Sequence, residues 1–311
     1  MSADDDKSSE VETADICCAS CGITEVDDVK LTECDGCDLV RYCSDACQQD
    51  HRSQHEAKCK ERAAELREEL LFKQPESSYL GDCPICCVPL PLDQRKSMLQ
   101  SCCGKYICHG CDYTNRRRQL QENLERICLF CRHPIPNTME ESDKNLMKRV
   151  EANDLFAMNY MGGTHFNEGD YENALKYYTK AAELGNADAH YNLSLLYMKG
   201  HGVEKDYTKE IHHLEEAAIR GHAYARHNLG VYEGMKGRFE RAVNHYIIAA
   251  NLGYDESIQT LKKYYKNGHV SKDDFAAALR AHHAAVKAMK SPQRDAAEKY
   301  DKRRREMEDR E

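Results

Sequence analysis

The distribution of cysteine constrains this chain more than any other feature. All 17 cysteines lie between Cys17 and Cys131. Residues 1–15 are acidic and polar and contain no hydrophobic signal segment, so an oxidising, disulfide-forming compartment is not indicated. No stretch approaches the roughly 18 apolar residues of a membrane helix. We therefore expect a cytoplasmic or nuclear protein that does not enter a membrane and whose thiolates bind metal, with disulfide pairing as the alternative.

The first cysteine-rich segment, residues 17–59, contains two C-x2-C pairs, then a C-x3-C pair and an H-x3-C pair. A C-x2-C turn directs two thiolates at one ion, and ligands four residues apart share one face of a helix. Eight such ligands form two closed tetrahedral Zn²⁺ sites, which are structural because no position remains for water or substrate. Cys17 is a spare that could replace Cys18, and His51 is expected on a helix surface.

This spacing resembles the MYND zinc finger over the whole segment, with the family signature Y-C-S-x-x-C-Q at residues 42–48. The resemblance implies a groove for proline-containing peptides that uses Ser44 and Gln48. Arg52 stands where the family has a tryptophan and is a poorer apolar wall. The resemblance also implies interleaved ligands, with Cys18, Cys21, Cys43 and Cys47 on one ion and Cys34, Cys37, His55 and Cys59 on the other.

The second cysteine-rich segment, residues 83–136, has a C-P-I-C knuckle, a central cluster at 102–111 and a C-L-F-C knuckle. It resembles a RING finger, but Lys105 occupies the position of the usual histidine ligand, so both central ligands are expected from Cys102 and Cys103. The implied cross-brace places Cys83, Cys86, Cys108 and Cys111 on one ion and Cys102, Cys103, Cys128 and Cys131 on the other. Together the two segments would hold up to four Zn²⁺ ions.

Adjacent ligands on one ion are geometrically awkward, because neighbouring side chains diverge in extended backbone. Gly104 could relax the turn that follows them. The alternatives are that this site is weak or empty, or that His109 or His133 substitutes as a ligand. Cys87 is left over and is expected to be a small buried hydrophobe.

A RING-type ubiquitin ligase positions a conjugating enzyme and its thioester-linked ubiquitin without a covalent intermediate. The resemblance assigns the enzyme contact to Ile85 in the first knuckle and to Pro134. It assigns to Arg132, directly after the last ligand, hydrogen bonds to both ubiquitin and the conjugating enzyme. Leu129 replaces the proline usual in the last knuckle. The alternative is a structural RING-like fold in which Ile85 belongs to a minor core and Arg132 is a surface charge.

Residues 153–285 are internally repetitive. Phrases ending in A-A-x-x-G occur at 174–185, 210–221 and 242–253, and this period in the mid-thirties is typical of a helix–turn–helix solenoid. With the G-x-G-V-x-x-D loop at 200–206, the pattern resembles Sel-one-like repeats, relatives of the tetratricopeptide repeat. The resemblance implies a concave face that binds protein segments. A degenerate fourth unit is expected at about 255–285, and we expect His212, His213, His282 and His283 to be solvated.

The expected fold is mainly α, with two small zinc-stabilised α+β modules followed by an α-solenoid. The remaining segments are a disordered acidic N-terminus (1–15), a helix and linker (60–82, helical over 60–73) and a charged C-terminal helix or tail (286–311). The net charge of −9 and the pI of about 5.9 argue against nucleic-acid binding. We expect either a RING-type ubiquitin ligase or ligase subunit that recruits substrate on its repeats, or a non-catalytic adaptor that scaffolds protein complexes.

Overall fold

The computed structural model describes residues 17–25 and 29–308. The expected disordered segment, residues 1–15, lies outside the described part of the chain. Contacts divide the chain into two units, Met1–Leu71 and Phe72–Glu311, and each is described by itself. Among the described residues, no helix has both the length and the apolar character needed to cross a membrane.

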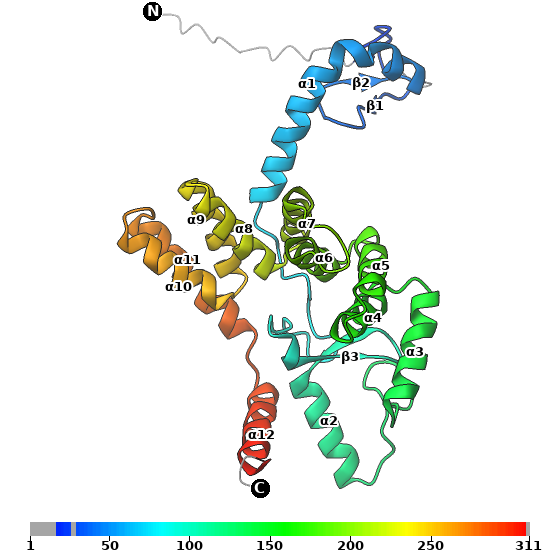
Figure 1. Cartoon of the computed structure of the whole chain (residues 1–311), viewed down its shortest axis with the longest axis vertical. Coiled ribbons are helices and arrows are strands. Elements are labelled where there is room, and N and C mark those ends of the chain that lie inside the picture. Colours follow the sequence, from blue (N-terminus) through cyan, green and yellow to red (C-terminus); the bar gives the residue numbers. More distant parts are fainter. Residues whose placement is uncertain (1–16, 26–28, 309–311) are drawn as a thin grey trace, which may run out of the picture. The chain divides into compact units, whose positions relative to one another are not determined.

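The first unit consists of a short hairpin and most of a long helix (Figure 1). Strand β1 (Thr32–Glu33) pairs antiparallel with β2 (Arg41–Tyr42), and α1 runs over Asp45–Phe72. The helix expected at 60–73 is therefore the last part of one longer helix. The Ser44 hydroxyl accepts a hydrogen bond from the Cys47 amide and so caps the start of α1. The helix ends before Pro75, as the steric restriction ahead of proline requires.

In the second unit, the linker is followed by the second cysteine-rich segment, residues 83–136, which is called the RING-like segment after its sequence resemblance. The 3₁₀ turn η1 (Gln94–Lys96) leads into β3 (Ser97–Gln100), which pairs antiparallel with β4 (Lys105–Cys108). Helix α2 (His109–Gln121) follows β4 directly. The small core contains Leu90 and Ile107, which pack among the cysteine sulfurs.

The repeats form successive helix pairs, as the period predicted. Helix α3 precedes them, and their bounds are α3 (Met139–Glu151), α4 (Leu155–Asn167), α5 (Tyr171–Glu183), α6 (Ala187–Lys199), α7 (Tyr207–Ile219), α8 (Ala223–Met235), α9 (Phe239–Asn251), α10 (Asp255–Lys266) and α11 (Lys272–Ala288). Each A-A-x-x-G phrase ends in a glycine of positive φ just beyond its helix, where a side chain would be strained. Fully buried alanines within the same phrases let neighbouring helices approach closely.

The RING-like segment packs along the N-terminal ends of the first helices of the repeats. The Gln94 side-chain amide donates to the Asp188 carboxylate at 2.8 Å, and the same carboxylate lies 3.1 Å from His222 Nε2. The Tyr79 ring stacks on the His222 ring with centroids 4.5 Å apart. The predicted linker, residues 74–82, is thus held against the repeat array.

The charged C-terminal segment forms α12 (Pro292–Glu308), which packs against α2. Ala297 is buried, and the Tyr113 and Tyr300 rings lie 5.1 Å apart. The Arg294 guanidinium donates to the carbonyls of Val88 (3.1 Å) and Pro89 (2.7 Å). One face of this helix is therefore a packing surface for the RING-like segment.

The prediction that all four paired histidines are solvated is wrong for His282. That side chain is buried, with Nδ1 3.2 Å from the Ala250 carbonyl and Nε2 3.0 Å from an Asp255 carboxylate oxygen. His213 is half-buried, and its Nδ1 lies 3.1 Å from His190 Nδ1. These contacts join helices far apart in the sequence, so local spacing gave no indication of them.

The contact between α2 and α12 can be tested at Gly110. A Cβ at this position would lie 2.6 Å from the Arg294 backbone nitrogen, so we expect Gly110→Ala to lower the free energy of unfolding by about 1–3 kcal/mol. Gly163→Ala is the matched control, because its Cβ would meet only the Tyr178 hydroxyl at 3.7 Å. The control should be neutral or stabilising by up to about 1 kcal/mol. Urea unfolding at equal zinc content measures both, and equal effects would contradict the close contact.

Candidate metal centres

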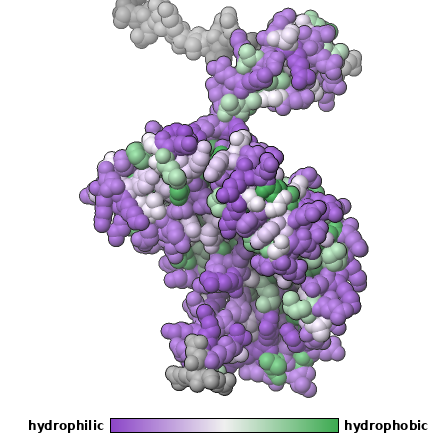
Figure 2. All heavy atoms as spheres, in the orientation of Figure 1, coloured by the Kyte–Doolittle hydropathy of each residue, from purple (hydrophilic) through white to green (hydrophobic). Residues whose placement is uncertain are grey.

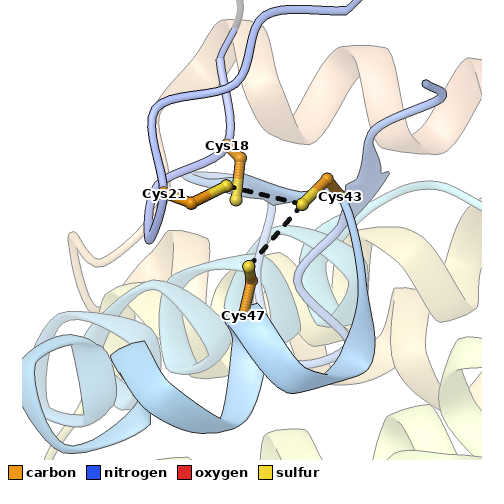
Figure 3. Close-up of side chains that lie close together, drawn as sticks. All are labelled: Cys18, Cys21, Cys43 and Cys47. Carbon is orange, nitrogen blue, oxygen red and sulfur yellow. Dashed lines mark hydrogen bonds between the residues drawn. The ribbon is translucent and has the colours of Figure 1, made fainter.

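Cluster 1 is formed by Cys18, Cys21, Cys43 and Cys47, whose sulfurs converge in Figure 3. Cys18 and Cys21 lie on one turn, in which the Gly22 amide donates to the Cys18 carbonyl. Cys43 follows β2, and Cys47 lies in the first turn of α1. The Cys43 sulfur is 3.5 Å from that of Cys21 and 3.6 Å from that of Cys47.

Cluster 2 is formed by Cys34, Cys37, His55 and Cys59. The first two cysteines lie on the turn between β1 and β2, and the other two ligands lie one turn apart on α1. The Cys34 and Cys59 sulfurs are 3.7 Å apart, and the Cys37 sulfur is 3.1 Å from His55 Nε2. His55 is buried, and His51 stacks on it while its Nδ1 lies 3.1 Å from the Tyr42 hydroxyl. His51 thus supports a candidate ligand.

Cluster 3 is formed by Cys83, Cys86, Cys108 and Cys111. The knuckle turn closes with the Cys87 amide donating to the Cys83 carbonyl, while Cys108 ends β4 and Cys111 lies in the first turn of α2. The Cys86 and Cys108 sulfurs are 3.8 Å apart. Arg294 on α12 donates to the Cys86 sulfur at 3.8 Å, so α12 contacts a candidate ligand directly.

Cluster 4 is formed by Cys102, Cys103, Cys128 and Cys131, and it includes the two adjacent cysteines. A tight turn between β3 and β4 folds both toward the second knuckle, with the amides of Cys103 and Gly104 donating to the Gln100 carbonyl. Gly104 has φ +66°, and a Cβ there would collide with the Asp154 and Arg149 side chains. The Cys103 to Cys128 and Cys102 to Cys131 sulfur distances are 3.9 and 3.4 Å.

These distances fit tetrahedral zinc. A Zn–S bond of about 2.3 Å places neighbouring sulfurs about 3.8 Å apart, whereas a disulfide requires about 2.05 Å. Every cysteine from Cys17 to Cys131 is a free thiol in the described structure. The disulfide alternative is therefore not favoured, and four clusters of four ligands match up to four Zn²⁺ ions.

The shifts in the pKa values of the clustered thiols are consistent with sites that bind a cation. In cluster 3, hydrogen bonding from the Cys108 thiol lowers the pKa of Cys83 to about 4, whereas burial raises the pKa of Cys111 to about 12. In cluster 1, hydrogen bonding to Cys21 raises the pKa of Cys43 to about 12. Neighbouring thiolates repel one another, so a cluster holds several of them only around a positive ion.

The cysteines and histidines left outside the clusters have other environments. Cys17 is exposed and belongs to no cluster. The prediction that Cys87 is buried is wrong, because the residue is exposed and has φ +53° at the end of the knuckle turn. His109 Nδ1 lies 3.0 Å from an Asp301 carboxylate oxygen, and His133 Nδ1 lies 3.2 Å from the Cys131 carbonyl.

The residues assigned to peptide binding lie at the start of α1. The Ser44 hydroxyl is occupied as a helix cap, and the Gln48 amide donates to the Asp35 carboxylate at 3.2 Å. Arg52 is exposed. Leu39 is also exposed in this unit and was not anticipated.

The residues assigned to the conjugating-enzyme contact are all exposed. Ile85 is exposed within the first knuckle, and Arg132 and Pro134 are exposed after the last ligand. Arg132 has φ +61°, in the same position relative to its knuckle as Cys87. Phe130 was not among the predicted site residues; it is an exposed aromatic side chain inside the second knuckle, and the Lys105 ammonium lies 5.9 Å from its ring centroid.

Comparison with known protein families identifies two kinds of module. The MYND finger family matches residues 18–59, which contain clusters 1 and 2. The Sel1 repeat family matches residues 154–186, 187–222 and 223–254, which correspond to the helix pairs α4–α5, α6–α7 and α8–α9. Clusters 3 and 4 lie between these matches and are compatible with an additional zinc finger.

The chain spans only a small part of the curated relatives that it matches. It is 30% identical over 73 residues to the DAP3-binding cell death enhancer 1 of Rattus norvegicus and to that of Mus musculus, covering 24% of this chain and 14% of each relative. Among solved structures, a Sel1 repeat protein from Oxalobacter formigenes is 28% identical over 58% of this chain and 73% of its own, with a TM-score of 0.43. The protective antigen c5321 of uropathogenic Escherichia coli is 20% identical over 53% of this chain and 37% of its own, with a TM-score of 0.39.

The family matches and the cluster geometry lead to one functional conclusion. The MYND finger and the clusters supply zinc sites, and the finger and the Sel1 repeats are modules that contact other proteins. This chain is a zinc-binding protein-interaction protein with a mainly helical fold.

Proposed function

We propose that all sixteen clustered side chains bind zinc, as two closed sites in each finger. The support is the convergence of each set of four and the tetrahedral sulfur spacing. The adjacent pair Cys102 and Cys103 is the least usual part of this assignment. Its support is the tight turn before Gly104, which removes the divergence expected of neighbouring side chains.

Zinc counting on single variants tests this assignment. We expect the full chain to carry four zinc ions by native mass spectrometry and the Cys103→Ser variant to carry three, because serine replaces one of four ligands in a site. Cys87→Ser is the matched control and should keep four, since Cys87 lies outside every cluster. Three ions in the unmodified chain, or four in Cys103→Ser, would contradict the assignment of cluster 4.

We further propose that the second finger acts as a RING-type ubiquitin ligase or ligase subunit. Its ligand order, in which clusters 3 and 4 alternate along the chain, is the cross-brace that this activity requires. The observation that carries the proposal is the exposure of Ile85 inside the first knuckle together with that of Arg132 after the last cysteine. In this function Ile85 and Pro134 contact the conjugating enzyme, and Arg132 orients ubiquitin so that a substrate lysine can attack.

The repeat array would recruit the substrate in this function. Packing of the RING-like segment on the array, through Gln94 and Asp188 among other residues, supports a fixed geometry between substrate and ubiquitin. A fixed distance favours transfer because catalysis by positioning depends on geometry.

A non-catalytic adaptor is the second candidate. It is favoured by Leu129, which replaces the proline usual in the last knuckle, and by the additional packing of α12 on α2. In that function both fingers and the repeats would serve only as binding surfaces.

An autoubiquitination assay with purified full-length chain and a broad panel of conjugating enzymes separates the two candidates. We expect ubiquitin chains with at least one enzyme and a loss of about tenfold or more in Ile85→Ala and Arg132→Ala, because each removes a contact that positions ubiquitin. Ile23→Ala and Arg52→Ala are matched controls on exposed residues of the first unit and should retain activity. If no enzyme of the panel yields ubiquitin chains, the adaptor function holds instead.

A further inference from the structure

Two arginine runs that are far apart in the sequence border one hollow of the second unit. Arg116 and Arg117 extend from α2, and Arg303, Arg304 and Arg305 extend from α12. The hollow has a volume of about 1700 Å³, and Arg126 also lines it. The packing of α12 on α2 brings the two runs together.

Much of this positive charge is not neutralised within the protein. Arg116 pairs with Asp112, and Arg304 lies 3.6 Å from a Glu308 carboxylate oxygen.

Among the described residues, Arg117, Arg126 and Arg303 form no ion pair. Seven acidic side chains also line the hollow, and five of them pair with other residues: Asp93 with Arg95, Asp112 with Arg116, Asp255 with His282, Glu298 with Lys96 and Asp301 with His109.

This concentration of positive charge contrasts with the net charge of the whole chain, which is −9. Ten basic and seven acidic side chains line the hollow, so its net charge is +3, and a net positive hollow attracts an anionic partner. Figure 2 shows that the face of the second unit in view is mostly hydrophilic, with scattered hydrophobic patches. The net positive charge of the hollow therefore indicates that its ligand is negatively charged.

Exposed apolar side chains border the same hollow and indicate that the ligand is not a simple anion. Leu120 is 79% exposed and Leu124 is 49% exposed, and both follow the arginine run of α2. Arginine beside large exposed apolar side chains is the composition of a protein-binding surface. The hollow is also far larger than one phosphate group requires.

We propose that this hollow binds an acidic protein segment that carries leucine-type apolar side chains. Its carboxylates pair with Arg117, Arg126 and Arg303, and its apolar side chains cover Leu120 and Leu124. An acidic protein is favoured over a nucleic acid because Leu120 and Leu124 offer exposed apolar surface for the side chains of a protein. The mutual packing of Tyr113 and Tyr300 also reduces the aromatic surface on which a base could stack. The proposal is independent of ubiquitin-ligase activity, since none of these residues belongs to the knuckles.

Fluorescence anisotropy with the full-length, zinc-loaded chain tests the proposal. The probe is a labelled 16-residue peptide of glutamate and leucine, with leucines at helical i, i+4 spacing. We expect saturable binding that weakens as salt rises, because exposed ion pairs are screened. The double variant Arg117→Ala/Arg303→Ala should bind about tenfold more weakly, and Leu120→Ser should also lose affinity.

Two controls keep this test specific. The double variant Lys262→Ala/Lys266→Ala removes the same charge from α10 outside the hollow and should bind the peptide as the unmodified chain does. A peptide with glutamine in place of glutamate should not bind. Circular dichroism and zinc content verify that each variant is folded.

Three results would overturn the proposal. They are no saturable binding of the acidic peptide, equal loss of affinity in the Lys262/Lys266 control, and tighter binding of a labelled 16-nucleotide single-stranded DNA than of the peptide. The last result would assign the hollow to nucleic acid.

Discussion

Tetrahedral coordination by cysteine is the interaction on which both fingers depend. The two strands of the first unit are only two residues long. Among the described residues of this unit, those that are buried are Tyr42, Leu71 and the candidate ligands Cys18, Cys37 and His55. Clusters 1 and 2 each join a turn in or before the hairpin to α1, and their ligands alternate along the chain. Zinc ions in these clusters therefore cross-link segments that otherwise have little apolar contact. Zinc binding and folding are coupled in such modules, because the site does not exist in the unfolded chain.

The second finger is also held by contacts with the repeats and with α12, whereas the first unit, taken by itself, contains no comparable contacts to helices other than α1 among its described residues. Asp188 of the repeats accepts a hydrogen bond from Gln94 just before β3, and the His222 ring stacks on Tyr79 of the linker. Arg294 of α12 donates to the Val88 carbonyl after the first knuckle. The C-terminal helix thus returns to a segment some two hundred residues earlier in the chain and completes its surroundings. This return produces both the fixed relation of finger to repeats and the arginine-lined hollow.

Sequence reasoning succeeded where the determinants are local. Knuckle spacing and helical i, i+4 spacing indicated the candidate metal ligands, and the A-A-x-x-G phrases indicated the helix pairs. The grouping of the ligands into four sets, which converge in the structure, came from the family resemblances. It failed where the determinants are long-range. Neither the packing of Tyr79 on His222 nor that of α12 on α2 has a periodic signal, because each depends on which surfaces meet after folding. The prediction that Cys87 is buried was wrong for a local reason, because the positive φ of this residue turns its side chain out of the knuckle and into solvent.

Hydrogen exchange read by mass spectrometry, before and after zinc removal by a strong chelator, tests the role of coordination most directly. If sulfur–zinc bonds hold the fingers, amides of residues 17–59 and 83–131 should lose protection on chelation, while those of the repeat helices between 155 and 288 should keep it. Unchanged protection in both cysteine-rich segments after complete zinc removal would contradict the account.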